Sequence, residues 1–346
     1  MSGDGDSRSG VGAVGAVSGH VPVLLNEVVE ALALSDGQVI VDGTFGGGGY
    51  TRAMFAAADV HVIGFDRDPS AGAAAAAFLR DQPDRFSFHA APFSTMANHI
   101  ATPVDGVVLD IGVSSMQLDD AARGFSFQGD GPLDMRMSAA HGQDLEGAAT
   151  AADIVNTLPE EKLANLIYQL GDERRSRGIA RAICRRRADC LFDSTKDLAA
   201  VVAKAYGRPP KDGRNPATRT FQALRIAVND ELGELARGLY GAEALLKPGG
   251  RLVVVTFHSL EDRIVKRFLA LRSGKLAGGS RHLPVKQQID RPTFQIINQR
   301  PLSPSNQEIA ANPRARSAKL RRGVRTDAAI PAPDFEALGL PNWEQT

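Results

Sequence analysis

The residues best suited to chemistry lie around one glycine-rich stretch, residues 39–50, with the sequence VIVDGTFGGGGY. The apolar run from Gln38 to Val41 predicts a buried strand, because apolar residues without alternation are typical of a strand covered on both faces. The glycines that follow permit positive φ angles and leave no Cβ to keep a ligand away from the backbone. A turn of this kind, leading into a helix from about Tyr50, presents free amide groups to a ligand at the carboxyl end of a sheet.

A second group of chemically useful residues is acidic. Residues 60–65 predict a strand, and Asp66 ends it about 20 residues past the glycine turn, where an acid can bind a ribose. A carboxylate suits this place because it can accept hydrogen bonds from both ribose hydroxyls. Asp68 could do the same, or could begin the alanine-rich helix that follows Pro69. We favour Asp66, because it directly ends the strand.

The glycine loop differs from two common nucleotide-binding patterns. The dinucleotide pattern G-x-G-x-x-G fails because its third glycine would fall on Thr51, and the P-loop fails because no Gly-Lys-Ser/Thr follows. The pattern that is left, D-x-T-x-G-x-G from Asp42 to Gly48, resembles the first motif of class I S-adenosylmethionine-dependent methyltransferases. Thr44 stands where many members carry glycine. A plain glycine-rich turn between a strand and a helix is the alternative.

Two further strands are expected to bring side chains to the same edge of the sheet. Residues 86–89 predict a third strand, and Phe93 in its exit loop would lie near an adenine ring or pack in the core. Residues 105–110 predict a fourth strand, which ends in Asp110. In this fold the loop after that strand faces the transferred methyl group. The Asp/Asn-Pro-Pro-aromatic element that often occurs there in enzymes acting on exocyclic amines is absent.

The alternation of strands and helices stops between residues 118 and 215, where the apolar spacing is helical. This segment of roughly one hundred residues is long enough to form a separate small domain. Arginines concentrate within residues 171–187, and Arg185, Arg186 and Arg187 end the run. Guanidinium groups suit contact with phosphate groups, whereas a solvated helix face is the plain alternative.

The parent fold is expected to resume with a helix at residue 216. Asn215 as N-cap and Pro216 at the first helical position predict its start. Arg219 and Gln222 lie off the buried stripe of this helix, on its first turns.

The last predicted elements complete a seven-stranded sheet. Residues 252–257 predict a fifth strand, followed by a helix that Ser259 can cap. His258 would stand at the strand end beside the cleft, as a functional group or as a hydrogen-bonded structural one. Residues 293–302 and 317–325 can form a final hairpin.

These elements predict an α/β fold of the class I methyltransferase type, a Rossmann-like seven-stranded sheet with an inserted all-helical domain. The sheet domain would comprise residues 20–117 and 216–325, and the substrate-recognition insertion residues 118–215. Residues 1–19 and 326–346 have compositions typical of disordered tails.

Composition limits the number of domains, the cellular compartment and the kinds of partner that we expect for this chain. Its 346 residues, 43% of them hydrophobic, can form a large core and more than one domain. No apolar run approaches the ~20 residues that cross a bilayer, so no membrane partner is expected. Cys184 and Cys190 fit no metal or disulfide spacing, which indicates reduced thiols in the cytoplasm, and we assign no metal ligands. The net charge is zero, so any nucleic-acid contact depends on local basic patches.

Several longer motifs occur in one order and together resemble the bacterial ribosomal RNA small subunit methyltransferase H family, over roughly residues 20 to 325. The motifs are residues 42–49, 110–120, 123–127, 131–137, 215–224, 257–268 and 312–320. The resemblance implies S-adenosylmethionine-dependent N4-methylation of a cytidine in the decoding region (P-site) of 16S ribosomal RNA. It implies that this RNA is met within the small ribosomal subunit, and it leaves a homodimer open.

The resemblance also assigns roles by motif position. It implies cofactor contacts at Gly48, Gly49, Tyr50, Asp66, Phe93, Asp110 and Gln117. Tyr50 replaces a histidine found in many members and Met116 a common proline, so the contact at Tyr50 is expected to differ. To the RNA substrate we assign Arg185, Arg186, Arg187, Arg219 and His258.

The chemistry that the resemblance implies makes its own demands. The exocyclic nitrogen of cytosine is a poor nucleophile, because its lone pair is delocalised into the ring. Acceptors that hold the hydrogens of the amine would help this nitrogen rehybridise, and Asp110 is the first candidate, with Ser114 and Ser115 weaker ones. A strong general base is less needed, since the proton becomes acidic once the nitrogen is cationic. Alignment of the methyl donor and the nucleophile contributes more to the rate than a general base does.

Three rival functions share parts of this pattern. A DNA amino-methyltransferase would have the same fold, but the missing Pro-Pro-aromatic element counts against it. A nicotinamide oxidoreductase is disfavoured by the missing third glycine of the loop. A non-catalytic RNA-binding protein with a relic loop would not bind S-adenosylmethionine, which calorimetry can test.

Overall fold

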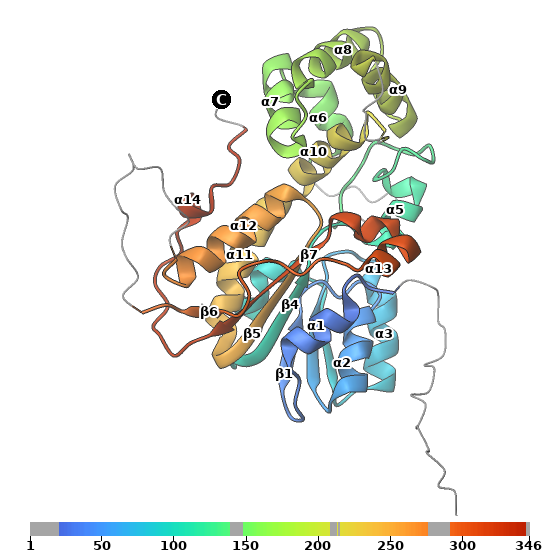
Figure 1. The fold of residues 1–346 in the computed structure, drawn as a ribbon. Helices are drawn as coiled ribbons and strands as arrows, with labels where there is room; N and C mark the ends of the chain where they lie inside the picture. Colours follow the sequence, from blue (N-terminus) through green and yellow to red (C-terminus); the bar gives the residue numbers. More distant parts are fainter. Residues whose placement is uncertain (1–20, 139–147, 208–212, 214, 276–290, 344–346) are drawn as a thin grey trace, which may run out of the picture.

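A seven-stranded sheet lies at the centre of the fold (Figure 1). The computed structural model describes residues 21–138, 148–207, 213, 215–275 and 291–343. The strands follow the order β3-β2-β1-β4-β5-β7-β6 across the sheet. Their bounds are β1 Val39–Asp42, β2 His61–Phe65, β3 Phe86–His89, β4 Val104–Asp110, β5 Leu246–Thr256, β6 Phe294–Ile296 and β7 Lys319–Arg325. Strands β1 to β5 are parallel, and β7 runs antiparallel to both β5 and β6, which confirms the predicted Rossmann-like sheet.

The strand boundaries differ from the predicted ones on the C-terminal side of the sheet. β5 begins at Leu246, earlier than predicted, because its pairing with β4 continues through a register irregularity between Val104 and Gly106. The chain between β6 and β7 forms α13 (Asn306–Ala311) and the short helix η3 (Pro313–Ser317). The last two strands are therefore antiparallel neighbours, as expected, but they are not joined as a tight hairpin.

Helices cover both faces of the sheet, as expected for parallel strands (Figure 1). One face packs against α1 (Leu25–Leu32), α2 (Gly49–Ala57) and α3 (Ala71–Asp81). The other face packs against α4 (Met96–His99), α11 (Glu231–Leu245) and α12 (Ser259–Arg272). Successive residues of β5 serve the two faces, since Val253 lies in the first apolar core and Val254 in the second.

Helices α6 (Ala151–Thr157), α7 (Glu160–Gly171), α8 (Ser176–Asp189) and α9 (Thr195–Tyr206) form the inserted bundle (Figure 1). α10 (Thr218–Asn229) leads back to the sheet and packs closely against α7. A Cβ at Gly171 would lie 2.5 Å from the carbonyl oxygen of Arg219, so the glycine permits this approach. Leu166 of the bundle belongs to the same apolar cluster as Val254 of the sheet. The bundle and the sheet thus share one continuous core.

Two predicted helix caps are wrong. α10 begins at Thr218 with Ala217 as its N-cap, and Asn215 instead accepts a hydrogen bond from the amide of Ala217 at 2.9 Å. α12 is capped by His258, not by Ser259. The imidazole of His258 accepts from the amide of Glu261, whose carboxylate accepts in return from the amide of His258 at 3.1 Å. A ring nitrogen can replace the usual hydroxyl because it is also an acceptor.

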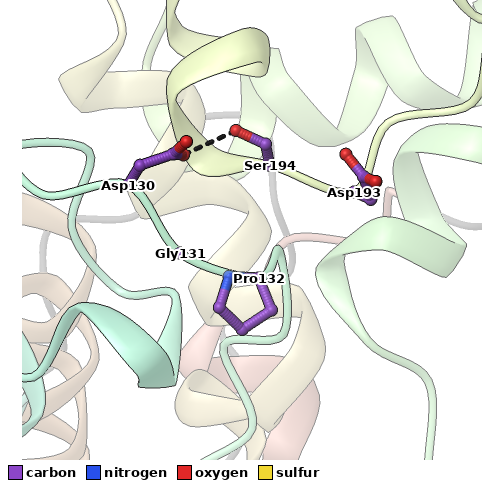
Figure 2. A pocket seen from close by; sticks show the side chains of 5 residues that line it. All are labelled: Asp130, Gly131, Pro132, Asp193 and Ser194. Atoms are coloured by element: carbon purple, nitrogen blue, oxygen red, sulfur yellow. Dashed lines mark hydrogen bonds between the residues drawn. The ribbon is translucent and has the colours of Figure 1, made fainter.

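The chain from Asp120 to Met137, which we call the strap, follows the short helix α5 (Ser115–Asp119) and contains the short helix η2 (Ala121–Arg123). It is fastened to the helical bundle at a shallow notch (Figure 2). The hydroxyl of Ser194 donates to Asp130 at 2.6 Å, and the amide of Thr195 donates to the carbonyl of Gly131 at 2.9 Å. The strap therefore belongs structurally to both parts of the chain.

Residues 326–343 do not form the disordered tail that we predicted, because they pack against α11 and α12. The ring of Phe335, in the short helix α14 (Phe335–Leu338), lies 5.1 Å from that of Tyr240. Arg272 donates to the carbonyls of Pro331 and Ala332, both at 3.3 Å. The predicted N-terminal tail, residues 1–19, and residues 344–346 lie outside the described residues. Among the described residues, none of the helices combines the length and the apolar character that a membrane span requires.

Candidate active site

One cavity of about 690 Å³ opens at the carboxyl ends of β1, β2 and β4. Its walls come from the glycine loop, the ends of these strands, the strap, α10 and the residues that follow β5. The strap contributes Phe127, and α10 contributes Phe221. The cavity therefore lies where the sheet meets the inserted segments, at the edge where open α/β sheets bind ligands.

The glycine loop lines the cavity with backbone from Gly43, Gly46, Gly47 and Gly49. Gly48, which we expected to contact the cofactor, is not part of the lining. It adopts a positive φ of 73°, and a Cβ there would lie 2.5 Å from Cε2 of Phe78. Gly48 thus serves the packing of the loop against α3, whereas its neighbours face the cavity.

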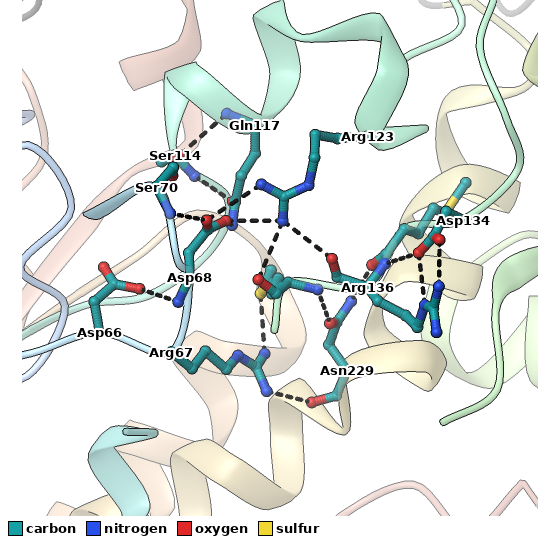
Figure 3. A network of polar contacts seen from close by, with 12 residues as sticks. Asp66, Arg67, Asp68, Ser70, Ser114, Gln117, Arg123, Asp134, Arg136 and Asn229 are labelled. Atoms are coloured by element: carbon teal, nitrogen blue, oxygen red, sulfur yellow. Dashed lines mark hydrogen bonds and ion pairs between the residues drawn. The ribbon is translucent and has the colours of Figure 1, made fainter. Parts of the chain in front are cut away.

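Asp66 and Asp68 have different surroundings, which settles how each is used within the protein (Figure 3). Asp66 lines the cavity and accepts from the amides of Gly46 and Asp68, both at 2.8 Å. Burial raises the pKa of Asp66. Asp68 binds the guanidinium of Arg123 at 2.9 Å and the amide group of Gln117. Burial alone would raise the pKa of Asp68, but these partners lower it below its usual value. The contacts of Asp66 are compatible with the ribose role that we predict for it.

Asp110 ends β4 and also lines the cavity. Its amide donates to the hydroxyl of Thr44 at 2.7 Å, which fixes the end of the strand. Its carboxylate oxygen Oδ1 is buried and has no hydrogen-bond partner among the described residues. Burial, assisted by the carboxylates of Asp42 and Glu261, raises the pKa of Asp110 to about 8. A buried acceptor without a partner is unusual and marks a place for a ligand donor.

Tyr50 is 4% exposed and sits at the base of the cavity. Its hydroxyl donates to the carbonyl of Val23 and lies beside Asp110, where it works against the rise of that carboxyl's pKa. The hydroxyl is therefore already engaged, and the cofactor contact that we predict at Tyr50 would be made by the ring or backbone.

Helix α5 and its N-cap, Ser114, include three of the predicted site residues. Ser114 and Gln117 form a capping box, in which the hydroxyl of Ser114 accepts from the amide of Gln117 at 3.2 Å. The side-chain amide nitrogen of Gln117 donates to the carboxylate of Asp68. Gln117 also lines the cavity. Ser115 also lines the cavity. Phe93 lines it from the short helix η1 (Phe93–Thr95) and packs over Gly238, where a Cβ would lie 2.3 Å from its ring.

Four charged or titratable side chains lie together at the α10–α12 side of the cavity. Arg225 binds Glu231 at 2.7 Å, and Nε2 of His258 lies 2.8 Å from Glu261. Burial tends to raise the pKa of Glu261, but His258 and then Arg225 outweigh it and lower the value. Glu231, His258 and Glu261 bring ligand atoms within 4.8 Å of one another, a spacing that could hold a metal ion. Arg225 already binds both oxygens of Glu231, and His258 contacts Glu261, so these contacts account for the spacing.

The arginines that we assigned to RNA differ in whether their side chains already bind other parts of the protein. Arg186 binds Asp197 of α9 at 2.7 Å, and Arg187 donates to the carbonyls of Val155 and Leu158 beside α6. These two side chains hold the bundle together, so they are not free for phosphate. Arg185 is exposed. Arg219 donates to the carbonyl of Asp172 at 2.9 Å and is not part of the cavity lining, whereas His258 is.

Several lining residues were missed from the sequence. They are Gly43, Gly46, Gly47, Phe127, Phe221, Arg225, Glu231, Glu234, Asn312 and Arg314. Those in the glycine loop could have been included, since every glycine of the loop was visible. The others come from distant segments, and only their place in the shared motifs, such as Asn312 and Arg314, could have indicated them.

Comparisons with known proteins agree with this geometry. A sequence model described as the MraW methylase family matches residues 17–325. The chain is 55% identical over 322 residues to "Ribosomal RNA small subunit methyltransferase H" of Caulobacter vibrioides, which covers 92% of this chain and 98% of that protein. A protein of the same name from Methylobacterium sp. (strain 4-46) is 54% identical over 321 residues, covering 91% and 93%.

Among solved structures, an rRNA methylase from Streptococcus thermophilus matches with a TM-score of 0.39 and 10% identity, over 88% of this chain and 94% of that one. The sequence matches extend across both the sheet and the inserted bundle. The chain therefore belongs to the MraW methylase family and is an S-adenosylmethionine-dependent methyltransferase with a class I, Rossmann-like fold.

Proposed function

We propose that the chain methylates N4 of a cytidine in the decoding region (P-site) of 16S ribosomal RNA, within the small ribosomal subunit in the cytoplasm. The printed name of its relatives supports small-subunit ribosomal RNA as the substrate class. The target atom is supported by one observation above all, the buried and unpartnered Oδ1 of Asp110 in the cavity wall.

The cavity fits the methyl donor. Its volume of about 690 Å³ lies within the usual range for a site that encloses a cofactor. The bare backbone of Gly46 and Gly47 permits close approach, and Asp66 offers acceptor oxygens for ribose hydroxyls. A side chain at Gly43 would displace Leu109, because a Cβ there would lie 2.4 Å from Cδ2 of Leu109. When bound, S-adenosylmethionine would supply an electrophilic methyl group on its sulfonium.

Asp110 is the group that would prepare the nucleophile. Its free carboxylate oxygen can accept a hydrogen bond from the N4 amine, which draws the amine hydrogens out of the plane of conjugation. The nitrogen lone pair then becomes available for in-line attack on the methyl carbon. After transfer the nitrogen is cationic and acidic, and the ionised carboxylate is placed to receive its proton.

The target base has to leave its stack to reach this position. Phe127 of the strap and Phe221 of α10 both line the cavity, with ring centroids 4.9 Å apart and an edge-to-face arrangement. Such rings are suited to hold an unstacked base, because every base has an apolar face. The RNA would therefore enter between the strap and α10.

The proposal is tested by transfer of labelled methyl groups to unmethylated small subunits, followed by nucleoside analysis of the RNA. We expect N4-methylcytidine at a single position. A different methylated nucleoside would refute the target, and labelling of naked RNA but not of subunits would refute the assembled substrate.

The role of Asp110 is tested by Asp110→Asn, which keeps the size of the side chain but removes its charge. We expect turnover to fall about 100-fold, as on removal of one preorganised electrostatic group, while cofactor affinity changes far less. The measurements are single-turnover rates and calorimetry with S-adenosylmethionine. Asp105→Asn, at the other end of β4, is the control. Equal losses of turnover and cofactor affinity in Asp110→Asn would mean that Asp110 only binds the cofactor.

A further inference from the structure

A bidentate ion pair between α10 and α11 forms part of the cavity wall. Nε and Nη2 of Arg225 lie 2.7 and 2.8 Å from the two carboxylate oxygens of Glu231. The side chains are 14% and 4% exposed, and both line the cavity. The turn between the helices, with Asp230 at a φ of 46°, brings the two residues together. A carboxylate fork of this kind fixes the plane of a guanidinium.

The pairing leaves one amino group of Arg225 for a ligand. Nη1 forms no hydrogen bond with any residue that the structure describes, whereas Nε and Nη2 are both engaged. Because the side chain lines the cavity, Nη1 adds two N–H donors to it. Arginine keeps its proton at any physiological pH, so these donors do not depend on conditions.

We propose that Arg225 determines base specificity, by donating to the N3 and O2 acceptors of the target cytosine while Asp110 accepts from its N4 amine. This inference rests on the proposed cytidine methylation. The pairing edge of cytosine presents one donor group followed by two acceptors, and the two side chains offer the complement. Uracil presents a carbonyl at position 4 and an N–H at N3. It would bring an oxygen to the ionised carboxylate of Asp110 and a donor to the guanidinium, and both contacts would be repulsive.

The neighbouring residues suit a positioning role for this arginine. Glu231 holds both engaged nitrogens, and Glu261, 0% exposed, adds a negative charge close enough to favour the charged form of Arg225. Removing Glu231 would free the guanidinium to rotate. The geometry thus makes Glu231 a positioning residue for Arg225.

The test uses free cytidine and uridine as inhibitors of methyl transfer to unmethylated small subunits. We expect cytidine to inhibit wild type at lower concentration than uridine, and Arg225→Met to lose about 10-fold or more of this preference, as for loss of a hydrogen bond to a charged group. The double variant Arg225→Met/Glu231→Gln avoids an unpaired buried carboxylate, so it tests the same point if the single variant does not fold. Affinity for S-adenosylmethionine should stay close to wild type in both.

Arg321→Met is the matched control, because Arg321 also binds a carboxylate, that of Asp262 at 2.7 Å, but is not part of the cavity lining. It should lose stability and keep the preference for cytidine. An unchanged preference in folded Arg225 variants would overturn the inference. If wild type makes no N4-methylcytidine, the proposed function fails instead, so the two failures are distinguishable.

Discussion

At the scale of single residues, the carboxyl group of Asp110 stands out in the cavity wall, because its Oδ1 is buried without a hydrogen-bond partner among the described residues. It lies near the carboxylates of Asp42 and Glu261, and it faces them without a cation of its own. Asp42 is buried and bound to the hydroxyl of Thr51 at 2.8 Å, and burial still raises its pKa to about 6. Such crowding destabilises a folded protein, and it is typical of sites where a function requires a perturbed acid.

The raised pKa of Asp110 predicts the pH dependence of the reaction. Because the ionised carboxylate is the better acceptor, the single-turnover rate at saturating cofactor should rise with pH through about 8, the pKa of this group. The same rise should be absent from Asp110→Asn. A wild-type rate that does not change between mildly acidic and alkaline pH would contradict the role of Asp110.

The same shift has a consequence of defined sign for stability. The folded protein holds the proton of Asp110 more tightly than the unfolded chain, so Asp110 weakens the fold increasingly as pH rises from the ordinary carboxyl value toward about 8. Asp110→Asn removes this pH-dependent loss of stability. Its melting temperature relative to wild type should therefore increase with pH over that window.

At the scale of elements, α8 shows how one arginine-rich run serves two purposes. Its buried side faces α6 and α9, which engage Arg187 and Arg186. Arg177, Arg181 and Arg185 recur at every fourth position, which places them along one exposed side of the helix. Arg181 binds Glu160 at 3.4 Å in a pair that is largely exposed and therefore weak. The exposed stripe, and not the whole run, is the candidate for phosphate contact.

We expect the double variant Arg177→Gln/Arg185→Gln to weaken binding of small-subunit RNA and to reduce the slope of log affinity against log salt by about 2, near 0.9 for each lost phosphate contact. Stability should hardly change, because neither side chain binds a described residue. Arg80→Gln, an exposed arginine of α3, is the control. An unchanged salt slope would show that the stripe is a solvated helix face that does not contact RNA phosphates. Replacing Arg186 or Arg187 would not answer the question, since each holds the bundle together.

At the scale of the whole molecule, the strap connects the cofactor side of the cavity with the substrate side. Arg123 at its start binds Asp68, two residues from Asp66, and its side chain is 9% exposed (Figure 3). Asn229 at the end of α10 binds the backbone of Met135 and Met137 at 2.7 and 2.8 Å. The aromatic wall at Phe127 lies between these two anchors. The position of this wall therefore depends on contacts with both halves of the molecule.

Arg123→Met should destabilise the protein by about 3 kcal/mol, because it leaves Asp68 buried without its cation. The KM for small subunits should rise more than the dissociation constant for S-adenosylmethionine, since the strap carries the substrate wall. Urea unfolding and steady-state kinetics measure these two effects. Arg80→Met, which breaks an exposed pair with Asp81, should cost about 1 kcal/mol or less. A loss for Arg123→Met as small as in this control would show that the strap is held by other contacts.

The sequence by itself determined the parts of this protein that depend on local order. The apolar runs predicted the parallel strands, and the glycine loop and Asp66 were expected at the edge where the cavity opens. These predictions succeed because strand periodicity and the conformational freedom of glycine act over a few neighbouring residues. Tails and caps were less predictable. Residues 326–343 are ordered through contacts with α11 and α12, which composition does not reveal.

Only the tertiary structure decided how side chains of one type divide between tasks. Gly48 packs against Phe78 while Gly47 faces the cavity, and Asp68 binds Arg123 while Asp66 keeps its place beside the glycine loop. The ion pair of Arg225 with Glu231 likewise depends on the turn between two helices. In each case the function of a residue is set by the partner that reaches it from a distant part of the chain. Spacing along the sequence cannot specify that partner, because it is the packing of the whole core that brings the two together.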